Sequence, residues 1–178
     1  MILGDKMKTI KITPRGYCHG VVGAINTITN LDHLSMKLPV YILGMVIHNK
    51  QMVSSLENLG YITLHDPSKT RIELLDLIES GTVIFTAHGV SPEVYKKAKQ
   101  KGLDIIDTTC DDVFKSQNVI KEYLNKGYEI IYIGKHTHPE SEAARGISNK
   151  IHIIEKMSEL YNFPIFTVAF PHFSNYQI

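Results

Sequence analysis

Thiol, imidazole and carboxyl side chains follow several predicted strands of this sequence, at the point where each strand ends. The set comprises both cysteines of the chain, three of its nine histidines and one glutamate. Its members are Cys18, Cys110, His48, His88, His138 and Glu140. Because ligands of open parallel sheets bind beyond the carboxyl ends of the strands, we expect these six side chains to converge on one site.

The residue types of this set predict a redox or metal site beside an anion pocket. Two thiolates can ligate a soft metal ion or an iron–sulfur cluster. Imidazoles at helix N-termini, where backbone N–H groups and the helix dipole favour negative charge, can hold a phosphate or diphosphate. A carboxylic acid beside them can relay a proton.

Each of these residues also has an ordinary structural interpretation. A single cysteine often packs as a small hydrophobic side chain, and Glu140 suits the first turn of a helix. Their common placement at strand ends favours the functional interpretation. His19 and His136 neighbour better candidates, and the sequence leaves open whether they point toward the site. The histidines for which nothing indicates a role are His33, His65, His152 and His172.

The elements that must position this site alternate between short strands and longer helices. Runs rich in β-branched and aromatic residues predict strands at 9–13, 40–43, 82–86, 104–107, 129–133 and 151–154. Helical spacing predicts helices at 21–31, 50–59, 71–79, 92–101 and 113–126. Ser91 before Pro92 predicts a helix start, and glycines at 60, 102 and 127 predict helix ends just before a strand.

This alternation predicts the α/β class with mainly parallel strands. It does not choose between one doubly wound sheet and two smaller sheets in tandem.

Composition and charge exclude several classes of protein. The 178 residues are 43% hydrophobic and 21% charged, as in soluble globular proteins. A net charge of +1 argues against a dedicated nucleic-acid binder. No apolar run reaches the roughly 18 residues of a membrane span, and the first six residues lack the apolar stretch of a signal peptide. We therefore expect a cytoplasmic protein with reduced cysteines that binds neither nucleic acid nor membrane.

Five segments around the candidate residues resemble the LytB/IspH family, the reductases of 4-hydroxy-3-methylbut-2-enyl diphosphate. They are Thr-Pro-Arg-Gly-Tyr-Cys at Cys18, Leu-Gly-Met-Val-Ile-His-Asn at His48, Thr-Val-Ile-Phe-Thr-Ala-His-Gly-Val-Ser-Pro at His88, Asp-Thr-Thr-Cys at Cys110, and Ile-Tyr-Ile-Gly-Lys-His-Thr-His-Pro-Glu at His138 and Glu140. Their order and spacing are those of the family, and the resemblance extends over about residues 7–161.

The resemblance implies a three-lobed architecture, each lobe a small parallel sheet flanked by helices, around a [4Fe–4S] cluster. It implies a reduction by two electrons, from a donor such as ferredoxin or flavodoxin, and two protons, which removes the substrate's hydroxyl as water. The products are isopentenyl and dimethylallyl diphosphate of the non-mevalonate isoprenoid pathway. The motifs match Cys18 and Cys110 to two cluster ligands, His48, His88 and His138 to the diphosphate-binding histidines, and Glu140 to the proton-delivering acid.

The sequence departs from the family in several respects. It has no third cysteine, Asp111 follows Cys110 where the family commonly has proline, and residues 165–178 do not resemble the Thr/Gln-rich segment of the longer family members. We therefore expect two of the three lobes, at 7–110 and 111–178, the second incomplete, preceded by an N-terminal extension at 1–6. The expected origin is a natural truncation, a frameshifted tail or a fragment.

Three functions stay open at this point. The first is the reductase, which we expect this chain not to perform alone, because two thiolates do not complete a cluster with one open iron. The second is a thiol or zinc hydrolase with Cys110 as nucleophile at a helix N-terminus, although no phosphatase-type Cys-x5-Arg loop follows Cys110. The third is a non-catalytic binding or interaction domain.

Overall fold

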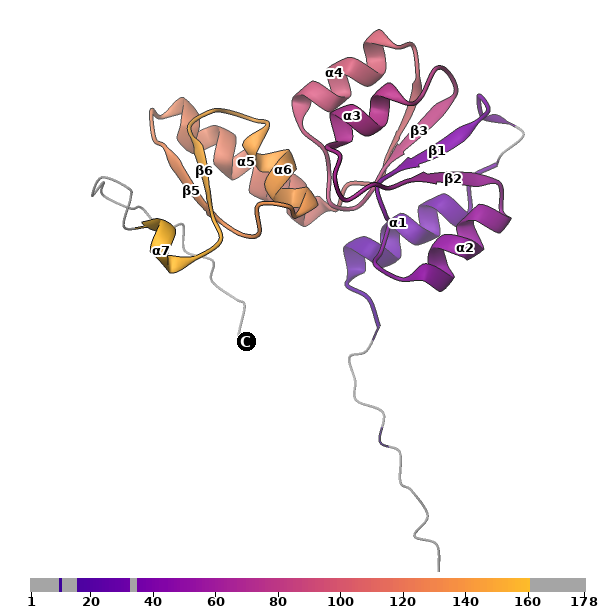
Figure 1. Cartoon of the computed structure of the whole chain (residues 1–178), viewed down its shortest axis with the longest axis horizontal. Helices are drawn as coiled ribbons and strands as arrows, with labels where there is room; N and C mark the ends of the chain where they lie inside the picture. The colour runs from indigo at the N-terminus through magenta and orange to yellow at the C-terminus, as the bar shows by residue number, and fades with distance from the viewer. Residues whose placement is uncertain (1–9, 11–15, 33–34, 161–178) are drawn as a thin grey trace, which may run out of the picture.

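The structure is a computed structural model that describes Ile10, residues 16–32 and residues 35–160 (Figure 1). Its strands are β1 (Val40–Leu43), β2 (Tyr61–Leu64), β3 (Thr82–Phe85), β4 (Asp104–Asp107), β5 (Ile130–Ile133) and β6 (Ile151–Ile154). Its helices are α1 (His19–Thr29), α2 (Lys50–Asn58), α3 (Arg71–Asp76), α4 (Pro92–Gln100), α5 (Asp111–Asn125), α6 (Pro139–Arg145) and α7 (Met157–Leu160).

The strands form two separate parallel sheets. The first has the order β2-β1-β3-β4, with Val40 of β1 opposite Tyr61 on one side and Thr82 on the other. The second pairs β5 with β6, with Ile130 opposite Ile151. The predicted α/β class is confirmed, and of the two arrangements that the sequence left open the structure has the tandem one.

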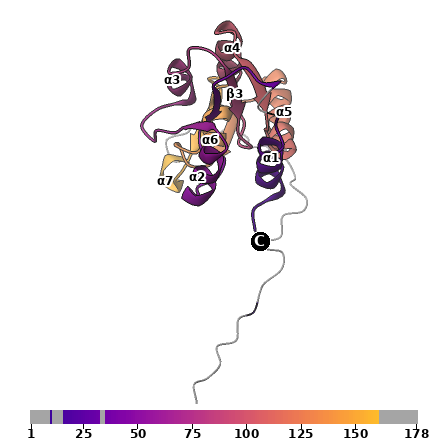
Figure 2. The ribbon, with the colours of Figure 1, turned by 90° about the vertical axis from the view of Figure 1, so that its right-hand side faces the viewer.

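Helices cover both faces of the first sheet (Figures 1 and 2). Leu43, Val83 and Phe85 pack with α3 and α4 on one face, whereas Val40, Ile42 and Ile84 pack with α1 and α2 on the other. Side chains alternate between faces along a strand, so these two strands supply both cores. β3 is therefore buried along its whole length, as expected for a central strand of a parallel sheet.

The second sheet has a smaller core. Ile120 of α5 and Ala144 of α6 pack with Ile151 and Ile153 of β6. The four residues of β5 are only partly buried or exposed, and Ile133 is 75% exposed.

The order of the first sheet places a topological switch between β1 and β3. The chain leaves β1 to form β2 on one side and then returns to form β3 on the other. In doubly wound sheets the crevice outside the carboxyl ends of such a strand pair is where ligands bind. His48 follows β1 and His88 follows β3, so both lie on segments that leave this edge.

The local signals for helix ends are confirmed. Ser91 precedes α4 and accepts a hydrogen bond from the N–H of Val94, with Pro92 as the first helical residue. Gly60, Gly102 and Gly127 have φ of 92°, 65° and 90°, the left-handed conformation that ends a helix.

Two helices begin earlier than their hydrophobic spacing predicts. α1 begins at His19 rather than residue 21, and α5 at Asp111 rather than residue 113. In each case the residue before the helix is a cysteine, which is not a typical capping residue. The early starts therefore had no capping signal, and they place both cysteines directly at helix N-termini.

Other predictions on the chain's organisation stay predictions. The proposed lobe boundary after residue 110 falls at the first residue of α5. The extension at 1–6, the end of the second lobe at 161–178 and most of the strand predicted at 9–13 lie outside the described residues. Within the described part of the chain no helix has the length and apolar character of a membrane span.

Candidate functional site

A cavity of about 370 Å³ lies between the first sheet and the helices of the second. Four of the six predicted site residues line it: Cys18, His88, Cys110 and Glu140. The remaining walls include His19, Gly20, Ala87, Asp112, Gln117 and Tyr132. Residues more than 100 positions apart in the sequence therefore face one space.

The two cysteines enter this cavity from helix N-termini. Cys18 precedes α1 and Cys110 precedes α5, and neither side chain makes a capping hydrogen bond to its own helix. The N–H of Cys110 donates to the carbonyl of Ala87 at 3.0 Å, which ties the start of α5 to the segment that carries His88. Both sulfurs therefore lie where backbone N–H groups of a helix N-terminus point toward a ligand.

The first turn of α1 approaches Cys110 so closely that a glycine is required there. A Cβ on Gly20 would lie 2.6 Å from the Sγ of Cys110. The absence of that side chain lets the N-termini of α1 and α5 converge on the cavity.

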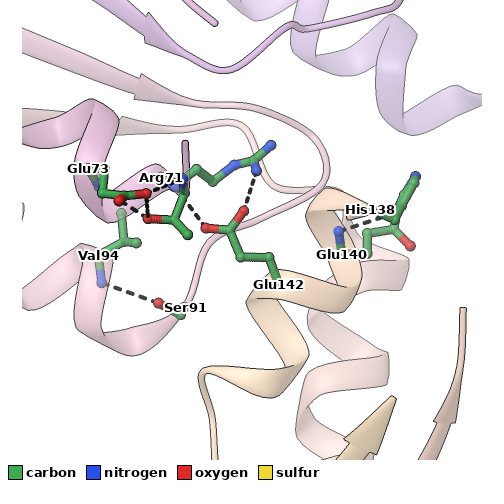
Figure 3. Close-up of polar contacts among 8 residues, drawn as sticks. Arg71, Glu73, Ser91, Val94, His138, Glu140 and Glu142 are labelled. Carbon is green, nitrogen blue, oxygen red and sulfur yellow. Dashed lines mark hydrogen bonds and ion pairs between the residues drawn. The ribbon is translucent and has the colours of Figure 1, made fainter. Parts of the chain in front are cut away.

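His88, His138 and Glu140 form a contact group at the edge of the same cavity. The Nδ1 of His88 lies 3.3 Å from the Oε1 of Glu140. The rings of His88 and His138 are 5.4 Å apart and nearly perpendicular. His138 precedes α6, and its Nδ1 accepts a hydrogen bond from the N–H of Glu140 at 3.2 Å (Figure 3). A neutral His138 therefore carries its proton on Nε2, where it can be donated to a ligand.

The surroundings lower the pKa of both His138 and Glu140, which leaves the histidine neutral and the glutamate ionised. Burial lowers the pKa of His138, the carboxyl of Glu140 opposes this, and electrostatic repulsion from His88, His48 and Arg71 lowers it further. The hydrogen bond with His88 lowers the pKa of Glu140, although partial burial opposes this. The group thus combines a carboxylate with a neutral imidazole at neutral pH.

His48 lies in a neighbouring cavity of about 270 Å³ rather than in the first one. This second cavity is also lined by His65, Lys69 and Arg71. His48 influences the pKa of His138 electrostatically, so the two residues lie near one another. Four of the six predicted residues thus line the first cavity and His48 lines the second, whereas His138 lines neither and joins the first through its contacts with His88 and Glu140.

A pair of buried contacts holds α6 in place beside the first sheet. Arg71, the first residue of α3, is 8% exposed. Its backbone N–H and its guanidinium donate to the two carboxylate oxygens of Glu142, both at 2.8 Å (Figure 3). This contact fixes the helix whose first turn carries Glu140 and whose N-cap is His138.

The sequence analysis did not identify several residues of the site. His19 faces it, with Nε2 3.7 Å from the Sγ of Cys110 and 3.1 Å from the Oδ2 of Asp112. Burial raises the pKa of Tyr132, which lines the first cavity. Adjacency to Cys18 and Cys110 was a usable signal for His19 and Asp112, whereas nothing near Tyr132 in the sequence distinguishes it from a packed strand residue.

Comparison with known proteins relates this site to one family. The family model described as LytB protein matches residues 9–170. A 4-hydroxy-3-methylbut-2-enyl diphosphate reductase of Bacillus cytotoxicus is 54% identical over 89% of this chain and 50% of its own length. The reductase of a Geobacillus strain is 52% identical over the same shares. The chain therefore spans about half the length of the curated relatives it matches.

Solved structures agree with the sequence comparisons. The structure of the E-1-hydroxy-2-methyl-but-2-enyl-4-diphosphate reductase from Plasmodium falciparum superposes with a TM-score of 0.74 at 29% identity, over 86% of this chain and 46% of that one. A second structure, titled as the terminal enzyme of the non-mevalonate pathway, gives a TM-score of 0.66 at 30% identity, over 82% and 50% of the two chains. The match to the family model and the similarity to these relatives in sequence and fold show that the chain belongs to the LytB family.

Proposed function

We propose that this protein serves the reduction of 4-hydroxy-3-methylbut-2-enyl diphosphate to isopentenyl and dimethylallyl diphosphate. The observation that carries the proposal is the contact group of His88, His138 and Glu140 beside a cavity that both cysteines line. An anion-binding group and an acid thus adjoin a pair of thiols, as the reaction requires. Membership of the LytB family supports the same assignment.

His48, His88 and His138 bind the diphosphate in this proposal. The hydrogen bond from the N–H of Glu140 to Nδ1 of His138 leaves Nε2 as the donor toward the ligand. His88 is oriented by the contact of its own Nδ1 with Glu140. Each ring therefore presents its second nitrogen with its orientation already fixed, which lowers the entropic cost of binding.

In this proposal Glu140 delivers a proton to the hydroxyl group of the substrate. Its carboxylate is ionised at neutral pH when no ligand is bound, since the hydrogen bond with His88 lowers its pKa. A diphosphate brought next to it adds negative charge, which favours the protonated acid. The proton held on a Glu140 oxygen can then pass to the hydroxyl of the substrate, which departs as water, while the two electrons and a second proton from solvent form the new C–H bond.

Cys18 and Cys110 would each bind one iron atom of a [4Fe–4S] cluster. The fit rests on their chemistry and placement: two thiols without capping partners, at adjoining helix N-termini, line one cavity. When bound, the cluster supplies the two electrons of the reduction, which come from a ferredoxin- or flavodoxin-type donor. The sequence contains these two cysteines and no third.

Titration calorimetry of the full chain with the diphosphate substrate tests the anion site. Each lost charge-assisted hydrogen bond costs roughly 1.5–3 kcal/mol, so we expect H88A and H138A each to weaken binding by at least about tenfold. His152 belongs to β6, where it contacts Glu129, and H152A is the matched control with unchanged binding. Unchanged affinity in H88A would remove His88 from the site and contradict the proposal.

Anaerobic reconstitution with iron and sulfide tests the thiol pair separately. Because the chain supplies two thiolates and not three, we expect the wild-type chain to develop a brown colour that bleaches readily in air, and the C18S and C110S variants to develop none. A chain that stays colourless under conditions in which it binds the diphosphate would contradict the role proposed for the cysteines and leave the anion site intact.

A further inference from the structure

Three different metal-binding side chains meet at the N-termini of α1 and α5. They are His19, the first residue of α1, Cys110, which precedes α5, and Asp112 in the first turn of α5. One potential ligand atom from each lies within 4.8 Å of those of the other two. Among the described residues this is the one group of three or more histidine, cysteine and acidic side chains with that geometry.

The distances within this group match those between ligands of a single ion. Zinc binds histidine nitrogen and carboxylate oxygen at about 2.0–2.1 Å and thiolate sulfur at about 2.3 Å. Around a tetrahedral ion these bond lengths place nitrogen and sulfur about 3.6 Å apart and nitrogen and oxygen about 3.3 Å apart. The observed separations from Nε2 of His19 are 3.7 Å to the Sγ of Cys110 and 3.1 Å to the Oδ2 of Asp112.

Nε2 of His19 is within hydrogen-bonding distance of both other side chains, and a single proton on it can serve only one of them well. A cation placed where the three lone pairs converge satisfies all of them at once.

The surroundings suit an ion that can be exchanged with solvent. The side chain of His19 is 73% exposed and that of Asp112 is 42% exposed. Lys115 contacts the other carboxylate oxygen of Asp112, Oδ1, which leaves Oδ2 for the ion. Thiolate and carboxylate together carry two negative charges, which balance a divalent cation. The set supplies three protein ligands and borders the cavity of about 370 Å³, from which water can take the fourth position.

We propose that His19, Cys110 and Asp112 bind one divalent ion of the zinc class. Nitrogen, sulfur and oxygen ligands in tetrahedral positions are the preference of Zn²⁺ among the common divalent ions. The site shares Cys110 with the thiol pair, so the ion and an iron–sulfur cluster on Cys18 and Cys110 exclude each other. It does not depend on Cys18, and this separates the two kinds of occupancy experimentally.

Titration of the reduced, metal-free full chain with Co²⁺ tests this proposal. Cobalt adopts zinc's tetrahedral geometry and reports it by visible absorbance, and a thiolate ligand adds a charge-transfer band in the near ultraviolet. We expect both signals to saturate at one ion per chain and to disappear when Zn²⁺ displaces the cobalt.

Variants assign the ligands. Loss of a ligand exceeds the 10–100-fold cost of losing an outer contact, so we expect H19A and C110S each to weaken Co²⁺ binding by at least about 100-fold. D112N should weaken it while the sulfur charge-transfer band remains. C18S is the matched control, because it removes the other thiol at a helix N-terminus and should bind with unchanged affinity. Circular dichroism confirms the fold of each variant, and the exposure of His19 makes H19A a mild change.

Two results would overturn the proposal. If H19A binds cobalt as the wild type does, His19 is no ligand. If C18S loses binding as completely as C110S, the ion lies between the two cysteines. A chain that fails to bind cobalt but binds the diphosphate would refute this site alone, whereas the reverse result would refute the proposed function alone.

Discussion

His138 and Glu140 lie two residues apart on the start of α6, yet the protein shifts their protonation in ways that complement each other. Burial is the largest influence that lowers the pKa of His138. The hydrogen bond with His88 is the largest influence that lowers the pKa of Glu140. The pair is therefore set to receive an anion and to take up protons as the anion arrives.

We predict that diphosphate binding is coupled to proton uptake. The hydrogen bond with His88 holds the pKa of Glu140 below its ordinary value in the ligand-free protein. A bound diphosphate favours the protonated acid, so the pKa of Glu140 rises from that lowered value, whereas His138 stays neutral because its Nδ1 accepts the N–H of Glu140. Between these two values binding takes up a proton, so the affinity increases as the pH falls and levels off below the lower value.

Calorimetry in buffers of different ionisation enthalpy measures this uptake directly. The observed binding enthalpy should vary with the buffer in the wild type. E140Q, which keeps the shape and a polar side chain but cannot titrate, should show a smaller dependence. A binding enthalpy independent of the buffer across the neutral range would contradict the coupling.

Gly20 yields a second prediction at the residue scale, with a control in the same helix. Glycine to alanine inside a helix normally stabilises it by up to about 1 kcal/mol. At Gly20 the added Cβ would lie 2.6 Å from the Sγ of Cys110, whereas at Gly23 it would meet nothing within 4 Å. We expect G23A to raise the free energy of unfolding and G20A to lower it by about 1–3 kcal/mol through overpacking.

Urea denaturation of the two variants measures the difference. The reactivity of the Cys110 thiol toward a small alkylating reagent, followed by mass spectrometry, should change in G20A and stay unchanged in G23A. Equal stabilisation by both substitutions would show that α1 does not approach Cys110 as described.

At the scale of elements, the site depends on how α6 is docked. Arg71 and Glu142 are 71 positions apart in the sequence, and their two hydrogen bonds join α3 to α6. Because the side chain of Arg71 is only 10% exposed, removing its partner leaves a buried charge without compensation.

We predict that E142Q destabilises the protein by about 2–3 kcal/mol, the cost of weakening hydrogen bonds to a buried charged group. It should also weaken diphosphate binding, because α6 carries His138 and Glu140. E122Q, which removes an exposed ion pair with Lys126 within α5, is the control and should change neither property measurably. Thermal unfolding and calorimetry provide the two measurements, and full retention of both by E142Q would contradict the role assigned to this contact.

The elements themselves were largely predictable from the sequence. β1, β4 and β6 have the predicted bounds, because short runs rich in β-branched residues are a local signal for a strand. The partition into two sheets was not predictable, because periodicity records which residues face a core and not which strand lies alongside.

For the candidate site, the proximity of four residues was predictable, whereas their roles stay predictions. Strand exits identified Cys18, Cys110, His88 and Glu140, which share one cavity. The separation of His48 into a second cavity and the orientation of His19 depend on side-chain packing between distant elements. Neither has a local signal in the sequence.

At the scale of the whole molecule, the two sheets differ in their capacity to stand alone. The first has four strands and two cores, whereas the second has two strands and one small core. Two-stranded sheets are marginally stable without further packing. The second sheet therefore depends on α5 and α6 and on their contacts with the first part of the molecule.

One such contact is the close approach of Gly146, after α6, to Ser91, before α4. A Cβ on Gly146 would lie 2.3 Å from the Cβ of Ser91. The φ of Gly146 is −71°, which any residue adopts without strain. An alanine there therefore acts by sterics alone and forces the two segments apart.

We predict that G146A selectively loosens the second sheet. Because regions open with free energies set by their own packing, amide hydrogens of β5 and β6 should exchange faster in G146A than in the wild type. Those of β1 and β3, buried between two layers of helices, should exchange at unchanged rates. G23A, which adds the same methyl group to α1 where nothing lies within 4 Å, controls for the substitution itself. Hydrogen exchange followed by mass spectrometry resolves these segments.

Uniform acceleration in both sheets would mean that the molecule unfolds as one cooperative unit. No acceleration anywhere would mean that the segments around Ser91 and Gly146 are not in contact. Selective acceleration of β5 and β6 is the result expected if the helix contacts that assemble the site also hold the second sheet in place.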